Sequence, residues 1–278
     1  MNIDLLETEL RKHIYYHADN CMLLKGDSMH LLKCIKSESV DLTVTSPPYN
    51  IGKEYEDILP VTDYIEWISS WTSLVYNISK PSASFWLNLG YLPLKNKAKA
   101  LPIPYLIWNK ISFYLIQEVV WNYGAGVAGR LFFSPRNEKL LFYVKDKNNY
   151  TFNLDEVRDK NVKYPNQKKN GKLKCNPKGK NPTDVWYIPK VTSGKNRSSI
   201  ERTKHPAQFP EKLIERIVKV SSNINDIILD PFVGSGTTAV VCSRLNRNFI
   251  GIDCNEEYLH IAKNRIIRST QQLTLGKV

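Results

Sequence analysis

The sequence lacks the long apolar runs that a membrane-spanning helix requires. Nowhere in its 278 residues does an uninterrupted apolar stretch approach the roughly 18 residues at which such a segment becomes a candidate to cross a bilayer. Residues 1–12 mix acidic and basic side chains and have neither the basic start nor the apolar middle of a signal peptide. We therefore expect no membrane contact.

The chain is also poor in cysteine. It has five cysteines, an odd number, and contains no Cys-x-x-Cys spacing. A disulfide framework and a cysteine-based zinc site are both disfavoured by this pattern, and a reducing compartment fits it. We expect a cytoplasmic protein without a metal centre.

The positive charge is concentrated in one segment. Residues 145–204 hold 16 Lys and Arg against six Asp and Glu, whereas the rest of the chain holds 23 against 21. A localised basic segment on a nearly neutral body indicates a polyanionic partner, bound through phosphate neutralisation. A solvated lysine-rich loop is the alternative.

Apolar periodicity predicts strands that alternate with helices. Such alternation implies an α/β fold with a doubly wound, mostly parallel sheet covered on both faces. Between residues 147 and 194 the pattern is weak, and only one short strand is expected there. The expected strands are 21–25, 40–44, 83–89, 115–121, 139–144, 184–188, 227–230 and 248–253, and the expected helices begin at a Ser28 cap or span 64–76, 103–111, 210–220, 238–245 and 256–267.

A glycine turn, residues 230–238, follows one of these strands. Gly234 and Gly236 permit close backbone approach, and the helix start offers free N–H groups to a ligand. Asp253 ends the next strand, where an acid can accept hydrogen bonds from ribose hydroxyls. The turn lacks the Lys of a phosphate-binding loop, and nothing downstream suggests hydride chemistry; a tight turn without a ligand is the remaining alternative.

A second turn, residues 45–49, follows the strand at 40–44. Two prolines prevent that strand from continuing. Ser46 supplies a hydroxyl acceptor, Pro47 a rigid backbone carbonyl and Tyr49 a flat ring. An amino group on an aromatic ring is a poor nucleophile, and two acceptors would orient its lone pair.

Both turns, in this order, resemble those of the β group of amino DNA methyltransferases from bacterial restriction–modification systems. The resemblance implies an S-adenosylmethionine cofactor, double-stranded DNA as substrate and a base flipped out of the duplex. The Ser of Ser-Pro-Pro-Tyr indicates cytosine N4, with adenine N6 as the alternative. No Pro-Cys pair exists for cytosine-C5 chemistry, and protein and RNA enzymes with Asn-Pro-Pro-Tyr have the opposite order of turns.

The resemblance assigns the site residues. Gly26-Asp27-Ser28 resembles the turn that meets the adenine amino group, although Asp27 is also a natural helix cap. His205 resembles a residue near the methionine part, and Cys254 is expected as inert packing against adenine. The expected catalytic residues are Ser46, Pro47, Pro48 and Tyr49; the expected cofactor residues are Asp27, His205, Asp230, Phe232, Gly234, Gly236, Thr237, Thr238, Asp253 and Cys254.

The resemblance also divides the chain into a catalytic half (1–146), a target-recognition segment (147–204) and a cofactor-binding half (205–278). Residues 133–142 resemble a further family segment but depart from its usual His-Glu form, so Glu138 is assigned no chemistry. A homodimer and a cognate restriction endonuclease acting on the same site also follow from the resemblance. The expected DNA-binding residues are Lys168, Lys169, Lys172, Lys174, Lys178, Lys180, Lys195 and Arg197.

A DNA-binding protein that has lost catalysis is a remote alternative. Such a protein should show erosion at Ser46, Tyr49, Gly234 or Asp253, and all four are present.

Overall fold

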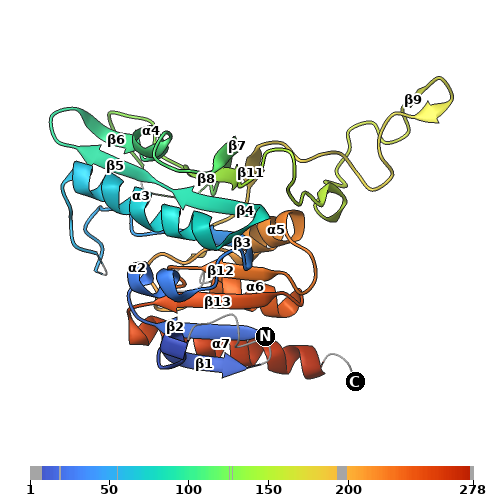
Figure 1. Ribbon diagram of the computed structural model, residues 1–278. Coiled ribbons are helices and arrows are strands. Elements are labelled where there is room, and N and C mark those ends of the chain that lie inside the picture. The colour runs from blue at the N-terminus through green and yellow to red at the C-terminus, as the bar shows by residue number, and fades with distance from the viewer. Residues whose placement is uncertain are drawn as a thin grey trace.

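The computed structural model describes residues 8–18, 20–54, 56–124, 126, 128–192 and 199–275. Within them, nine strands form one sheet in the order β1-β2-β13-β12-β3-β4-β8-β7-β11 (Figure 1). The run from β2 to β4 is parallel, whereas β1 and β8 are antiparallel to their neighbours. The strands are β1 (Ile14–Ala18), β2 (Cys21–Lys25), β3 (Val40–Thr45), β4 (Ser79–Leu89), β7 (Tyr114–Asn122), β8 (Asn137–Val144), β11 (Val185–Tyr187), β12 (Ile227–Asp230) and β13 (Asn248–Asp253).

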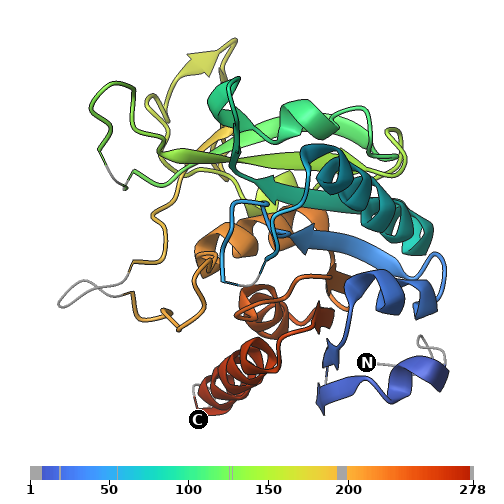
Figure 2. The ribbon, with the colours of Figure 1, turned by 90° about the vertical axis from the view of Figure 1, so that its left-hand side faces the viewer.

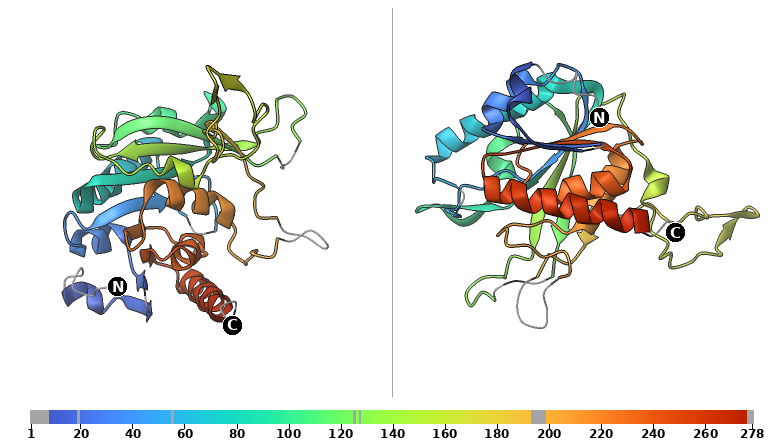
Figure 3. Two further views of the ribbon diagram at one scale, coloured as in Figure 1. Left: turned by 90° about the vertical axis from the view of Figure 1, so that its right-hand side faces the viewer. Right: turned by 90° about the horizontal axis from the view of Figure 1, so that it is seen from below.

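Helices cover both faces of the sheet, which confirms the predicted doubly wound α/β fold (Figure 3). Along β2, Met22 and Leu24 join the apolar cluster around α3, whereas Cys21 and Leu23 join the cluster under α5 to α7. No helix in the described part of the chain has the length and apolarity to cross a membrane. The helices are α1 (Thr8–Arg11), α2 (Ser28–Leu31), η2 (Leu32–Cys34), α3 (Val61–Ile78), α4 (Pro104–Ile107), η3 (Leu154–Glu156), α5 (Glu211–Ser221), α6 (Thr237–Arg244) and α7 (Glu256–Leu275).

Some local expectations were wrong. The helix expected over 103–111 is only the single turn α4, because the chain then tightens into a turn in which Lys110 N donates to Ile107 O (2.9 Å). Asp27, not Ser28, caps α2, since its carboxylate accepts from His30 N (3.0 Å). Ser28 is buried instead and donates to Pro231 O. A small separate sheet of β5 (Tyr91–Leu94) and β6 (Ala98–Pro102) was not foreseen.

The lysine-rich part of residues 147–204 leaves the sheet at the edge where the parallel strands begin. Strand β8 runs antiparallel to β4 and therefore ends at this edge, and β11, parallel to β7, starts from it. Between them lies a hairpin of β9 (Lys168–Lys169) and β10 (Lys172–Leu173), turned by Asn170 and Gly171 at positive φ. In Figure 1, β9 projects at the far right, while the parallel strands point to the left.

Candidate functional site

The two signature turns meet at the carboxyl edge of the sheet, which faces the viewer in Figure 2. Strands β3 and β12 are parallel neighbours, so the turns that follow them leave the sheet side by side. Thr45 Oγ1 donates to Asp230 Oδ1 (2.7 Å) across 185 residues of sequence. This edge is where open α/β sheets bind their ligands.

Both turns open into one cleft of about 1010 Å³. That volume reaches the upper end of the usual range for small-molecule sites. Its apolar wall includes Trp67, Phe232 and Val233. All of the expected catalytic and cofactor residues except Gly236 line it: Asp27, Ser46, Pro47, Pro48, Tyr49, His205, Asp230, Phe232, Gly234, Thr237, Thr238, Asp253 and Cys254.

The two glycines have different tasks. Gly236 is the left-handed N-cap of α6 (φ 75°), and a Cβ there would lie 2.6 Å from Ala262 Cβ on α7. It therefore allows the turn to pack against α7. A Cβ at Gly234 would lie 2.7 Å from His205 Nε2, so this glycine admits the ring of His205 beside the cleft.

Asp230 lies under the glycine turn and links it to the second turn, residues 45–49. Its buried carboxylate accepts from Thr45 Oγ1, from Thr238 Oγ1 (2.8 Å) and from Phe232 N (3.2 Å). Burial raises the pKa of Asp230 to about 6. Thr237 Oγ1 likewise accepts from Arg265 Nη1 (2.9 Å). Asp230, Thr237 and Thr238 thus shape the turn from beneath.

Asp253 holds the same turn from the side. Its carboxylate accepts from Gly234 N (2.9 Å) and Asn255 N (2.9 Å), and burial raises its pKa. A carboxylate has about four lone-pair sites, so acceptor capacity remains for a ligand. Beside it, partial burial and the charge of Asp253 raise the pKa of the Cys254 thiol, which agrees with an unreactive residue.

His205 is neutral at physiological pH. Burial lowers its pKa to about 4, and its ring packs edge-on against Tyr258 with centroids 4.4 Å apart. Its Nδ1 accepts from Ala207 N (3.3 Å). An uncharged imidazole therefore lies beside the glycine turn.

The second turn, residues 45–49, is predicted to be catalytic and is held in place by its neighbours. Tyr64 of α3 donates to Pro48 O (2.9 Å), and Pro47 is buried. The Tyr49 ring packs over Gly90, where a Cβ would lie 2.8 Å from Tyr49 Cε2. Ser46 Oγ donates to Tyr49 Oη (2.9 Å), which leaves the serine lone pairs available as acceptors.

Two residues at this turn were missed at the sequence level. Glu138 Oε2 accepts from Tyr49 Oη (3.1 Å) and from Asn88 Nδ2 (2.6 Å). Asn88 lies at the carboxyl end of β4, at the edge where open α/β sheets bind their ligands. Glu138 lies near the start of β8, and the antiparallel direction of β8 brings it to the same edge.

The expected DNA-binding residues that the structure describes do not line the cleft. Lys168, Lys169, Lys172 and Lys174 are exposed on or beside the β9–β10 hairpin, at the opposite edge. Lys178 pairs with Asp155 (2.8 Å) and Lys180 with Asp159 (3.2 Å), so both lysines form ion pairs within residues 147–204. Lys195 and Arg197 lie outside the described residues. The cations that line the cleft within the described chain are Lys53, Lys190 and Arg202.

Comparison with known proteins identifies the family. The family model of the N6 and N4 methyltransferases, described as DNA methylase, matches residues 40–264 of this chain. The chain belongs to this family. It is 59% identical over 259 residues to the type II methyltransferase M.ScaI of Streptomyces caespitosus, covering 93% of this chain and 85% of that protein. It is 33% identical to the DNA adenine methyltransferase YhdJ of Escherichia coli K12, over 88% and 82% of the two chains.

Solved structures give the same fold. PvuII DNA methyltransferase, described as cytosine-N4-specific, matches with a TM-score of 0.73 at 20% identity over 91% of this chain and 88% of that one. M1.HpyAVI in complex with S-adenosylmethionine matches with a TM-score of 0.60 at 25% identity, over 88% and 98%. The protein is a DNA methyltransferase, and its cofactor is S-adenosylmethionine. The glycine turn, the acid at Asp253 and the apolar wall of the cleft fit that cofactor.

Proposed function

We propose that this DNA methyltransferase modifies the exocyclic N4 of cytosine within a short duplex site and protects host DNA in a restriction–modification system. The observation that carries the choice of base is Ser46, an uncharged hydroxyl at the first position of the catalytic turn. Its proton is engaged by Tyr49, so Ser46 meets the substrate as an acceptor.

The catalytic residues act by orientation. S-adenosylmethionine, when bound, supplies an electrophilic methyl group on a sulfonium. Ser46 Oγ and the Pro47 carbonyl each accept a hydrogen bond from one N–H group of the target amine. Together they direct the lone pair of the amine toward that methyl group. Tyr49 offers the ring face that does not pack on Gly90 to the flipped base. Such positioning needs no covalent intermediate and supplies most of the rate enhancement.

S-adenosylmethionine binds at the other end of the cleft, to residues of the glycine turn and its neighbours. Asp253 accepts from the ribose hydroxyls, Asp27 meets the adenine amino group, and Cys254 packs against the adenine ring. His205 and the Gly234 turn hold the methionine part. These groups line one cleft together with Ser46, which supports this assignment, because the reacting centres must come within contact distance.

Adenine N6 is the competing target. The family spans both N6 and N4 enzymes, and the relatives include one described as an adenine methyltransferase. The cytosine-N4-specific description of PvuII methyltransferase and the serine at position 46 favour N4. Digestion of methylated plasmid DNA to nucleosides, followed by mass spectrometry, tests the proposal. N4-methyldeoxycytidine is expected, and N6-methyldeoxyadenosine alone would overturn the proposal.

The DNA duplex lies across the carboxyl edge in this proposal, and residues 188–192 and 199–204 of the target-recognition segment contact it near the target. The hairpin lysines bind phosphates of longer DNA at a distance from the cleft. A homodimer and a cognate endonuclease remain part of the proposal by resemblance alone.

Two sets of charge changes separate these roles. Because each lost phosphate contact lowers the slope of log affinity against log salt by about one, neutralising Lys190 and Arg202 should lower that slope by about two on a short duplex. Reversing Lys168, Lys169 and Lys172 to Glu should leave short-duplex binding unchanged and weaken binding to long DNA by about 10-fold. Fluorescence anisotropy at several salt concentrations measures both, and a short-duplex defect in the hairpin variant would place the target DNA at the opposite edge.

A further inference from the structure

The partly buried carboxylate of Glu138 ends a directional chain of hydrogen bonds that starts at Ser46. Ser46 donates to Tyr49 (2.9 Å), and Tyr49 donates to Glu138 Oε2 (3.1 Å). Asn88 Nδ2 lies 2.6 Å from both the Tyr49 and the Glu138 oxygens and donates to each. Each hydroxyl has one proton, and an ionised carboxylate can only accept. Glu138 therefore fixes the direction of the chain and turns the lone pairs of Ser46 toward the substrate.

We propose that Glu138 is a positioning residue for methyl transfer and the terminal acceptor of the proton that the target amine loses. This inference rests on the proposed amino-group methylation and applies equally to cytosine N4 and adenine N6. It corrects the expectation that Glu138 has no part in the chemistry.

The proton path balances. The amino nitrogen uses its lone pair to bond the methyl carbon, and the carbon–sulfur bond breaks with its electron pair on sulfur. The nitrogen then carries a positive charge and passes one proton to Ser46 Oγ. Ser46 passes its own proton to Tyr49, Tyr49 passes its proton to Glu138, and the resulting neutral carboxylic acid later releases the proton to water.

The environment of Glu138 suits an acceptor. Burial raises the pKa of Glu138, which makes its carboxylate a stronger base than an exposed one. Burial and the charge of Glu138 raise the pKa of Tyr49 well above its usual value, so Tyr49 stays protonated as a donor. The other ionisable groups that face the carboxyl are Lys190, after β11, and Tyr123, after β7. Activity should therefore fall as pH drops through the raised pKa of Glu138.

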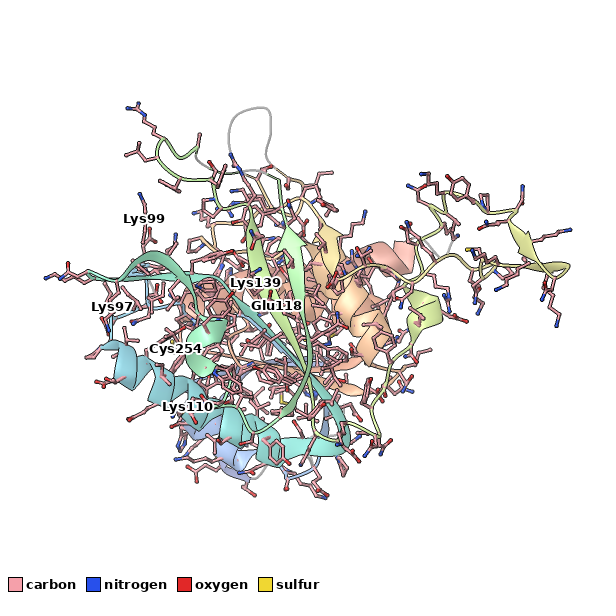
Figure 4. The ribbon with its side chains drawn as sticks, turned by 90° about the horizontal axis from the view of Figure 1, so that it is seen from above. Lys97, Lys99, Lys110, Glu118, Lys139 and Cys254 are labelled. Atoms are coloured by element: carbon pink, nitrogen blue, oxygen red, sulfur yellow. The ribbon has the colours of Figure 1, made fainter. Side chains whose placement is uncertain are left out.

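Glu138→Gln tests the proposal, because the amide keeps the shape and can accept from Tyr49 but takes up no proton. We expect single-turnover methyl transfer to fall by about 100-fold, with unchanged calorimetric affinity for S-adenosylmethionine and unchanged 2-aminopurine fluorescence on base extrusion. The acidic limb of the wild-type pH–rate profile should disappear. Glu118→Gln is the matched control. Glu118 on β7 pairs with Lys139 on β8 (3.2 Å), and Figure 4 shows this pair apart from Cys254.

A double-mutant cycle with Tyr49→Phe distinguishes a chain from separate contacts. If the groups act in series, each single variant should lose a similar factor and the double variant no more than the larger loss. Additive losses, or a Glu138→Gln enzyme with wild-type rate and pH profile, would overturn the inference. Failure of the proposed function is separate, because the wild-type enzyme would then yield no methylated amino base.

Discussion

Ser46→Ala should lower the rate of methyl transfer by about 100-fold and leave the affinity for S-adenosylmethionine unchanged. Removing Oγ takes away one of two acceptors that orient the target amine, and it also removes the first link of the hydrogen bonds to Tyr49. Tyr49 keeps its contacts with Asn88 and Glu138, so the aromatic ring should stay in place. The loss is therefore expected in the chemical step.

Single-turnover transfer of labelled methyl groups measures the rate of the chemical step, and calorimetry measures the affinity for S-adenosylmethionine. Ser37→Ala is the control, because Ser37 precedes the same strand at the opposite edge and donates only to Asn77 O (3.0 Å) within the described contacts. A Ser46→Ala enzyme with the wild-type rate would show that the hydroxyl does not meet the reacting amine.

The sequence predicts the two turns and their meeting well, for a physical reason. Val40–Thr45 and Ile227–Asp230 are short runs rich in β-branched or apolar residues. Each is followed within two residues by a proline, which does not extend a central strand. Parallel strands of one sheet all end at one edge, so the turns after them converge whatever their separation in sequence. The hydrogen bond from Thr45 Oγ1 to Asp230 Oδ1 joins the ends of the two strands directly.

Glu138 could not be found by the same rule. The rule searches the carboxyl ends of strands, and Glu138 lies near the amino end of one. Only the antiparallel direction of β8 places it at the cleft, and strand direction within a mixed sheet depends on tertiary pairing. A signal was present nonetheless, since an acidic residue that begins a strong apolar strand is rarely buried without a partner.

The basic segment shows the same limit. Its position between the two halves of the sequence says nothing about the edge of the sheet at which it lies. Because β8 ends at the edge opposite the cleft, the chain emerges there, and the hairpin lysines follow. The cleft receives Lys190 and Arg202 instead from the return path after β11, and Lys53 from the loop between β3 and α3.

Asp230→Ala should lower the free energy of unfolding by about 3 kcal/mol at about pH 4, where the buried carboxyl still holds its proton, and it should disturb both turns together. The variant leaves the buried hydroxyls of Thr45 and Thr238 without their acceptor. Urea denaturation measures the change. Asp63→Ala, at an exposed position in the first turn of α3, is the control and should shift the stability by less than about 0.5 kcal/mol.

The pH dependence separates the charge of Asp230 from its hydrogen bonds. Burial raises its pKa from 3.8 to about 6 in the folded protein, so the native state holds this proton more tightly than the unfolded state. Its contribution to stability is present in full below pH 3.8 and declines by roughly 3 kcal/mol as pH rises through 6. Asp230→Asn should remove that decline while keeping an acceptor. If wild type and Asp230→Asn show parallel stability curves between pH 4 and 7, the carboxyl is not desolvated and the two turns are joined by weaker contacts than the structure indicates.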